Sequence, residues 1–504
     1  MMMRKRPFTP LAVLGAMTLF SSISIAAVPC ESLVSLSLPN TTITSAQSVA
    51  ADKYVAPAGN QEAAFRSMPA FCRITATLRP SSDSDIKMEV WLPAQGWNGY
   101  FQGRGTGGMG GSIPLPAMAA TLKSGFATAG TDGGHTGDSS YALSHPEKVI
   151  DFGYRAAHEM NVQAKAILAA YYGQGPKLSF VDGCGTGAQS AQNAIQRYPG
   201  DYDAVAITGQ SHMSRHRVWQ LWAWDAVHKE EAGFIPSEKF EMIHNAVMNA
   251  CDALDGVRNR EIEDPRQCKF DPAVLQCRAG DGPSCLTQPQ VEALRRIYAG
   301  PSNPRTGEQL YFPPMPGSEL TFASTAAQEP FDYALEWGKY FVFDDPAWHP
   351  RTRPFNFDSD IALGETPENL LLNANNPDIR EFVNRGGKLL FYEGWSDGTT
   401  IPGISIDYYN RVVQTIGAEK ARDSVRLFMV PGMTHCEDRG EFNMVSELER
   451  WIQTQKAPDT IIGKRVRDGK AVGTRLLCRY PQVATYDGSG STDDAANYTC
   501  ETPR

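Results

Sequence analysis

Several features that define other protein classes are missing from this 504-residue sequence. No hydrophobic run beyond the N-terminal region is long enough to span a bilayer, which excludes a polytopic membrane protein. Basic residues are not in excess, since 47 Lys and Arg stand against 56 Asp and Glu, so no nucleic-acid partner is expected. No CxxC pair occurs, which argues against a zinc site. The 42% hydrophobic and 20% charged residues are typical of a globular protein. The length of 504 residues exceeds one ordinary domain and indicates a large core domain with an insertion, or two domains.

The first residues have the pattern of a targeting signal. Arg4, Lys5 and Arg6 precede an apolar stretch over residues 11–25 that is too short to span a membrane, and small residues surround Ala26. We therefore predict a secretory signal peptide over residues 1–26, with an uncleaved anchor helix as the alternative. Cleavage would leave 44 basic against 56 acidic residues, a net charge of -12. The mature protein is expected to be secreted or periplasmic, without membrane association.

The ten cysteines agree with export, because an even number in an oxidising compartment favours five disulfides. The close pairs Cys251 with Cys268 and Cys277 with Cys285 would each close a small loop. A polar stretch over residues 486–497 is expected to form a surface loop held by Cys478 and Cys500.

The middle of the chain has the alternation typical of a parallel α/β sheet. Residues 177–181 predict a short buried strand, residues 182–187 a tight turn, residues 188–197 a helix, and residues 204–207 another strand. The other elements expected in this domain are strands over residues 88–92, 126–130, 388–392 and 426–430, and a helix over residues 154–172.

Residues 212–353 differ in amino-acid composition from the sequence on either side. Tryptophans, prolines and four cysteines concentrate there. We therefore expect a lid domain over residues 212–353, inserted into a catalytic domain made of residues 27–211 and 354–504. Most of the lid tryptophans are expected to form the core of the lid, while an apolar wall for a substrate is the alternative.

The turn between the predicted strand and helix has the outline of a nucleophile elbow, G-x-S-x-G, with Gly185 where serine is expected. Asp397 and His435 each follow a later predicted strand, in the order in which α/β-hydrolases carry their acid and histidine. The aspartate would orient and stabilise the imidazole. The glycine loop that contains Gly108 would bring backbone N–H groups to an oxyanion. These observations predict an α/β-hydrolase core.

The chain resembles the tannase and feruloyl esterase family, which includes mono(2-hydroxyethyl) terephthalate hydrolase. The resemblance extends from about Cys30 to the C-terminus. The passages that carry it are residues 105–113, 125–135, 151–155, 183–187, 197–199, 251–265, 394–397 and 431–436. It implies an exported hydrolase that cleaves esters of aromatic (phenolic) acids, a disulfide between Cys184 and Cys436, and an oxyanion N–H from Thr186. No organic cofactor is expected.

The sequence departs from the family at the nucleophile, because the family pattern Gly-Cys-Ser-x-Gly-Gly has serine where this chain has Gly185. Three explanations stay open. The serine was replaced deliberately; the chain is a pseudoenzyme that binds aromatic esters without hydrolysing them; or it acts by another route. That route would be direct activation of water by His435 or, less favoured by its position, attack by Thr186.

Two further sites are expected. The resemblance implies a structural Ca²⁺ in the lid, held by the side chains of Asp252, Asp255 and Asn259 and the carbonyls of Val257 and Glu261. The family usually has Asp where Asn259 stands, and a disulfide-closed acidic loop without metal is the alternative. Trp395, two residues before Asp397, is the expected substrate-pocket residue.

Overall fold

A computed structural model describes residues 28–57, 62–210, 212–437, 440–467 and 469–503. The predicted signal peptide lies outside these residues. Among them, nine strands form one mixed sheet in the order β1-β2-β3-β5-β4-β6-β7-β8-β9. The pairs β1–β2, β2–β3 and β3–β5 are antiparallel, and from β5 through β4 to β9 all neighbouring strands are parallel. The strands are β1 (Thr41–Val49), β2 (Phe71–Leu78), β3 (Ile86–Pro93), β4 (Tyr100–Arg104), β5 (Ala127–Thr131), β6 (Leu178–Cys184), β7 (Ala204–Thr208), β8 (Lys388–Gly394) and β9 (Val425–Val430).

Helices cover both faces of the parallel part of the sheet, which explains why its strands are continuous apolar runs. On β8, Leu389 and Phe391 belong to one buried cluster, while Leu390 and Tyr392 belong to another. This is the two-residue period of a strand. The first cluster contains side chains of α3 (Ala156–Tyr172), α4 (Thr186–Arg197) and α12 (Gly403–Ile416), and the second those of α14 (Met444–Thr454).

The strand before the elbow is longer than predicted. β6 continues to Cys184 because Gly183 and Cys184 keep their pairing with Ile207 and Thr208 of β7. The turn is therefore confined to Gly185, and α4 begins at Thr186. Other local elements are α1 (Leu115–Lys123), α2 (Pro146–Ile150), α10 (Pro367–Leu370), α11 (Arg380–Asn384) and α13 (Ala418–Ser424).

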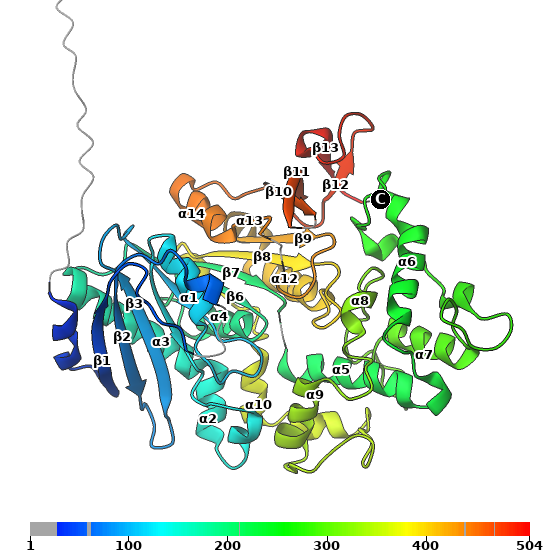
Figure 1. The fold of residues 1–504 in the computed structure, drawn as a ribbon, viewed down its shortest axis with the longest axis horizontal. Helices are drawn as coiled ribbons and strands as arrows, with labels where there is room; N and C mark the ends of the chain where they lie inside the picture. Colours follow the sequence, from blue (N-terminus) through cyan, green and yellow to red (C-terminus); the bar gives the residue numbers. More distant parts are fainter. Residues whose placement is uncertain (1–27, 58–61, 211, 438–439, 468, 504) are drawn as a thin grey trace, which may run out of the picture.

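Between β7 and β8 the chain leaves the sheet and forms a helical lid beyond the carboxyl ends of the parallel strands (Figure 1). Its helices are α5 (Met213–His228), α6 (Lys239–Cys251), α7 (Gln288–Ala299), α8 (Glu319–Phe322) and α9 (Asp332–Trp337). Trp219, Trp222, Trp337 and Trp348 are buried in one cluster there. The same cluster extends to Leu372, so the lid boundaries at 212 and 353 stay a prediction.

Two small hairpins complete the C-terminal region: β10 (Thr460–Arg467) pairs with β11 (Lys470–Cys478), and β12 (Val483–Tyr486) with β13 (Tyr498–Glu501). The prediction of five disulfides is confirmed. The pairs are Cys30–Cys72, Cys184–Cys436, Cys251–Cys268, Cys277–Cys285 and Cys478–Cys500. None of the helices formed by the described residues has the length and apolar character needed to cross a membrane.

Candidate active site

The elbow is a single residue with a backbone conformation that side chains rarely adopt. Gly185, with φ 56° and ψ −116°, joins β6 to α4. Glycine is also required around it for close packing: a Cβ at Gly105 would lie 2.6 Å from Cα of Gly187. A Cβ at Gly183 would lie 2.8 Å from the backbone nitrogen of Ala188. The glycine pattern therefore brings the loop, the strand and the helix N-terminus together at one point.

Asp397 and His435 form the pair expected from the sequence. Nδ1 of His435 lies 2.8 Å from Oδ2 of Asp397. The other carboxylate oxygen accepts bonds from the N–H and hydroxyl of Thr399, both at 2.9 Å, and from the N–H of Thr400 at 2.8 Å. Asp397 is almost completely buried, so these bonds fix its orientation and that of the imidazole.

The imidazole faces the elbow. A Cβ at Gly185 would lie 3.5 Å from Nε2 of His435, in ordinary contact, with nothing else within 4 Å except Cε1 of the same ring. The Cys184–Cys436 disulfide joins the residues next to Gly185 and His435, with Cα atoms 5.9 Å apart. The structure therefore brings Gly185, Asp397 and His435 together.

A second buried carboxyl, Glu393, lies behind this pair and was missed in the sequence. Its oxygens accept bonds from the N–H of Gly209 and the hydroxyl of Ser405, each at 2.8 Å. Burial raises the pKa of Glu393 to about 8, although those hydrogen bonds oppose the change. Burial lowers the pKa of His435, but the charge of Asp397 and its hydrogen bond to the imidazole outweigh this effect, so the pKa of His435 is raised overall. The one feature of the sequence that could have indicated this buried carboxyl is an acidic residue near the end of an otherwise apolar strand.

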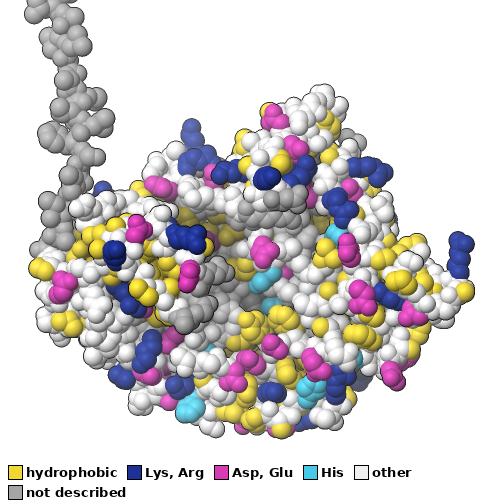
Figure 2. Space-filling model, viewed as in Figure 1, with side chains coloured by type: hydrophobic (Ala, Val, Ile, Leu, Met, Phe, Trp, Pro, Cys, Tyr) yellow, Lys and Arg dark blue, Asp and Glu magenta, His cyan; other side chains and the backbone are white. Residues whose placement is uncertain are grey.

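A cavity of about 140 Å³ opens beside His435. Its lining residues are Gly108, Gly185, Thr186, His216, Arg217, Gln220, Phe331, Tyr333, Thr399, Thr400 and His435. Core and lid both contribute, and Figure 2 shows the surface hollowed on this face, with histidine side chains beside the hollow. The lid residues were not predicted, because no local motif marks a side chain that reaches a cavity from another domain.

The structure does not place Trp395 on this cavity. Its indole is buried and lines two other pockets, with Arg266 stacked 5.3 Å from the ring centre. The expectation that Trp395 forms the substrate pocket is therefore corrected: Phe331 and Tyr333 are the aromatic side chains that line the cavity. The reason is that the loop after β8 turns Asp397 toward His435 and the indole toward the lid loop near Arg260.

Thr186 and Gly108 lie together at the cavity, where an oxyanion site is expected. The hydroxyl of Thr186 donates to the carbonyl oxygen of Gly108. Thr186 is the first residue of α4, so helix geometry leaves its N–H without a partner inside the helix. A Cβ at Gly108 would lie 2.9 Å from Cζ of Tyr333, so glycine allows the lid to approach this loop.

Comparison with known proteins decides the class of this site. The family model described as tannase and feruloyl esterase matches residues 72–501. The chain belongs to the tannase and feruloyl esterase family. An uncharacterized esterase of Xanthomonas campestris pv. campestris is 36% identical, covering 98% of this chain and 94% of that protein. A probable feruloyl esterase B-1 of Aspergillus terreus is 31% identical, covering 92% and 93%.

Solved structures agree with the family. Feruloyl esterase B from Aspergillus oryzae superposes with a TM-score of 0.86 at 28% identity, covering 94% of this chain and all of that one. Tannin acyl hydrolase from Aspergillus niger superposes with a TM-score of 0.73 at 19% identity, covering 94% and 95%, which supports the fold. The predicted α/β-hydrolase core with a large inserted lid is confirmed, and the chain is a carboxylic ester hydrolase by family.

The expected calcium loop of this esterase forms a tight turn in the lid. Oδ1 of Asp252 accepts from the N–H groups of Asn259 and Glu261, at 3.2 and 3.3 Å. Oδ1 of Asp255 accepts from the N–H of Val257 at 2.9 Å, while its buried Oδ2 has no partner among the described residues. Burial raises the pKa of Asp255 to about 6, and the charge of Asp252 adds to the effect.

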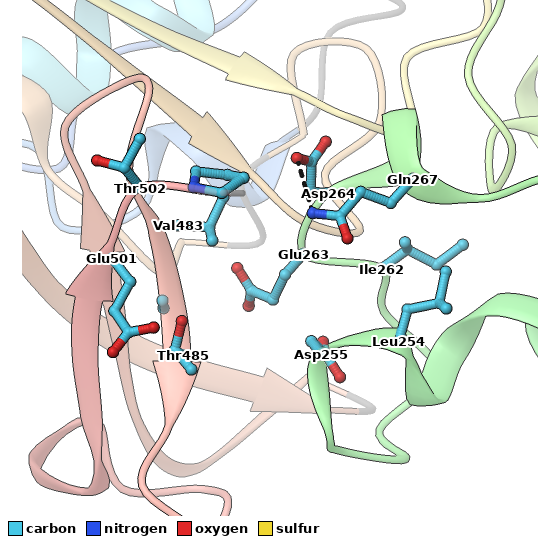
Figure 3. Close-up of a pocket in the computed structure, with 12 residues that line it drawn as sticks. Leu254, Asp255, Ile262, Glu263, Asp264, Gln267, Val483, Thr485, Glu501 and Thr502 are labelled. Atoms are coloured by element: carbon cyan, nitrogen blue, oxygen red, sulfur yellow. Dashed lines mark hydrogen bonds between the residues drawn. The ribbon is translucent and has the colours of Figure 1, made fainter.

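The loop also borders a pocket of about 240 Å³ beside the C-terminal hairpin. Figure 3 shows Leu254 and Asp255 on one side of this pocket, Thr485 and Glu501 on the other, and Glu263 between them. The donor set of the loop, carboxylates with backbone and amide oxygens, is of the kind that suits a hard cation.

Proposed function

We propose that the site of this chain is that of a hydrolase of aromatic-acid esters with a Ser-Asp-His mechanism, in which Gly185 stands in place of the serine. The observation that carries the proposal is the oriented His435–Asp397 pair facing Gly185 across the cavity. A serine at position 185 would place its hydroxyl beside Nε2 of His435. The oriented Asp397–His435 pair and the N–H groups expected from Gly108 and Thr186 support the remaining parts of such a site.

The chemistry follows from these positions once a hydroxyl stands at position 185. Nε2 of His435 takes the hydroxyl proton while the oxygen attacks the ester carbonyl. The N–H groups of Gly108 and Thr186 would stabilise the oxyanion, and His435 then returns the proton to the departing alcohol. In the second half of the reaction, His435 takes a proton from water while the water oxygen attacks the acyl carbonyl. The proton then returns to the oxygen at position 185, which releases the acid. Asp397 keeps the imidazole oriented throughout.

The aromatic part of the substrate is assigned to the lid side of the cavity. Phe331 and Tyr333 meet edge to face, with ring centres 5.4 Å apart and planes at 88°. Such a pair offers an apolar wall to an aryl group. Relatives that are called probable feruloyl esterases support substrates that are esters of phenolic acids.

A second candidate function is binding without hydrolysis. Gly185 favours it, because this residue offers no nucleophile while the cavity and the His435–Asp397 pair are complete. Thr186 is a poor substitute, since its hydroxyl is bonded to the carbonyl oxygen of Gly108. Direct attack by water activated at His435 is the remaining route to turnover.

Two further properties belong to the proposal. The basic and apolar residues before Ala26, together with five disulfides, support export to a secreted or periplasmic location. The unpartnered oxygen of Asp255 supports a structural Ca²⁺ in the lid loop. Asp252, Asp255 and Asn259, with the carbonyls of Val257 and Glu261, would hold the ion, which would balance the two acidic charges.

The test compares the chain as it stands with its Gly185→Ser variant on methyl hydroxycinnamates and methyl gallate. We expect the serine variant to hydrolyse these esters at least about 1,000-fold faster, because a triad without its nucleophile keeps only binding and oxyanion stabilisation. Adding His435→Ala to the serine variant should abolish the gain.

Gly185→Ala is the matched control for Gly185→Ser. Both side chains meet the same backbone penalty at φ 56°, about 1–3 kcal/mol of stability, but only serine adds a hydroxyl. Hydrolysis by the original chain that depends on His435 would contradict the proposal and indicate direct water attack. If esters bind to the original chain and neither it nor the serine variant turns over, the binding function is favoured.

A further inference from the structure

One cation of the cavity has no role in the chemistry described so far. Arg217 lies on α5 of the lid, is 3% exposed and lines the cavity beside Gly185 and His435. An arginine so thoroughly removed from water loses its hydration, and a buried charge is stable only with compensating partners.

The partners of Arg217 are neutral. One guanidinium nitrogen donates to Oε1 of Gln220 at 3.0 Å, and another lies 3.3 Å from Sδ of Met109. The ring of Tyr333 lies 5.3 Å from the guanidinium carbon. Nε has no hydrogen-bond partner among the described residues.

The other arginines buried to this degree in the described parts of the chain differ from Arg217. Arg426 pairs with Asp459, Arg465 with Glu261, and Arg475 with Glu261 and Glu441. Each has a carboxylate within hydrogen-bond reach, whereas Arg217 has none. Elsewhere in the described residues, a buried guanidinium is compensated by a carboxylate. The lack of a carboxylate partner is therefore specific to Arg217.

The charge of Glu336 acts on Arg217 from a distance, but none of the described carboxylates lies within ion-pair distance of the guanidinium. Among the described residues, no Asp or Glu lines the cavity. Asp397 is committed to His435 and two threonines, and Glu336 accepts bonds from Ser139. Burial lowers the pKa of Arg217 only to about 10, so the guanidinium stays protonated at neutral pH.

We propose that Arg217 determines specificity by binding a carboxylate of the substrate, so that this esterase prefers anionic half-esters to neutral esters. A substrate carboxylate would give the guanidinium an acidic partner. The planar guanidinium can donate two parallel hydrogen bonds to the two carboxylate oxygens. The inference rests on the proposed function, since it assigns one end of the substrate bound there. The aryl ring would then lie along Phe331 and Tyr333.

The experiment uses binding to the original chain, which avoids any dependence on turnover. Isothermal titration would compare monomethyl terephthalate with methyl 4-carbamoylbenzoate, its neutral counterpart of nearly the same shape. A second pair, carboxymethyl benzoate and carbamoylmethyl benzoate, carries the charge on the alcohol side. We expect roughly 10- to 100-fold tighter binding of the acid in one pair, which also shows which side of the ester meets Arg217.

The variants separate charge from packing. Arg217→Met should remove the preference for the acid while the amide binds as before, and Arg217→Lys should keep part of it. Arg215→Met is the matched control: Arg215 is two residues earlier on α5, is partly exposed and pairs with Glu365 at 2.9 Å. It should retain the full preference. If Arg217→Met does not fold, Arg217→Gln takes its place.

The outcomes are distinct. Equal binding of acid and amide in both pairs by the original chain, or a preference that survives Arg217→Met, would overturn the inference. In that case neutral aromatic esters can still bind, and Gly185→Ser can still hydrolyse them, so the proposed function would stand. If no aromatic ester binds and the serine variant is inactive, the proposed function itself fails.

Discussion

At the scale of single residues, Glu393 is the clearest case of a side chain whose environment sets its charge. It is the next-to-last residue of β8, its side chain is 1% exposed, and the charge of Asp397 acts on it. With its pKa raised to about 8, the folded protein holds a proton that the unfolded chain releases near pH 4.5. Stability should therefore fall as the pH rises between these values, because the folded state binds more protons there.

Glu393→Gln should flatten this dependence. The amide can still accept from the N–H of Gly209 and donate to Ser405, but it no longer titrates. We expect the variant to lose a slope of up to about 1.4 kcal/mol per pH unit between pH 5 and 8, measured by urea unfolding. His435 also titrates with a raised pKa, so some slope should remain. Glu381→Gln, on the surface of α11, is the control, and an unchanged slope in Glu393→Gln would contradict the prediction.

At the scale of elements, a buried ion-pair network joins the lid loop to the C-terminal hairpin. Glu261 pairs with Arg465 at 2.9 Å and Arg475 at 2.7 Å, and Arg475 also pairs with Glu441 at 3.1 Å. A Cβ at Gly432, three residues before His435, would lie 3.0 Å from Oε1 of Glu261. The network therefore links the lid, the β10–β11 hairpin and the loop that carries His435.

Glu261→Gln should weaken this junction strongly. Removing one charge leaves two buried guanidinium groups with only part of their compensation, which costs about 3 kcal/mol of unfolding free energy. Chemical unfolding would measure the loss. Asp378→Asn, which breaks the exposed pair with Arg380, is the comparison and should cost less than about 1 kcal/mol. Similar losses of unfolding free energy in the two variants would show that the buried network stabilises the protein no more than an exposed ion pair does.

At the scale of the whole molecule, the lid and the core share one hydrophobic cluster. Met109, Tyr141 and Phe152 of the core are buried with Trp219 and Trp337 of the lid. The cavity lies where these two parts meet, so the stability of the lid and the shape of the substrate site are coupled.

Calcium should therefore change the stability of the whole protein if the lid loop binds it. We expect Ca²⁺ at about 100 times its Kd to add about 2.7 kcal/mol, seen as a rise of a few degrees in Tm over a chelated sample. Asp255→Asn should lose the response, while Asp271→Asn, in another lid loop, should keep it. Equal Tm values with Ca²⁺ and with chelator would reject the calcium site.

The sequence predicted those parts of the fold that depend on local pattern. Apolar runs bounded by glycine turns located β3, β5, β6, β7, β8 and β9, and the glycines around Gly185 located the elbow. Close cysteine spacing located Cys251–Cys268 and Cys277–Cys285. The strands β1, β2 and β4 were not predicted. In β1 and β2 polar residues interrupt the apolar ones, and β4 has only five residues and ends in a glycine-rich passage. Trp395 was misplaced because spacing from Asp397 does not say which way a loop turns.

By itself, the sequence determined the class of this protein: an α/β-hydrolase with Gly185 at the elbow and with Asp397 and His435 after later strands of the sheet. These features are readable because strand period, glycine turns and order along the chain are local properties. Only the tertiary structure decided that Arg217 reaches the cavity with no carboxylate of the described residues in ion-pair distance, and that Glu393 is buried near the Asp397–His435 pair. Charge and protonation depend on neighbours brought from distant segments, and only packing determines those neighbours.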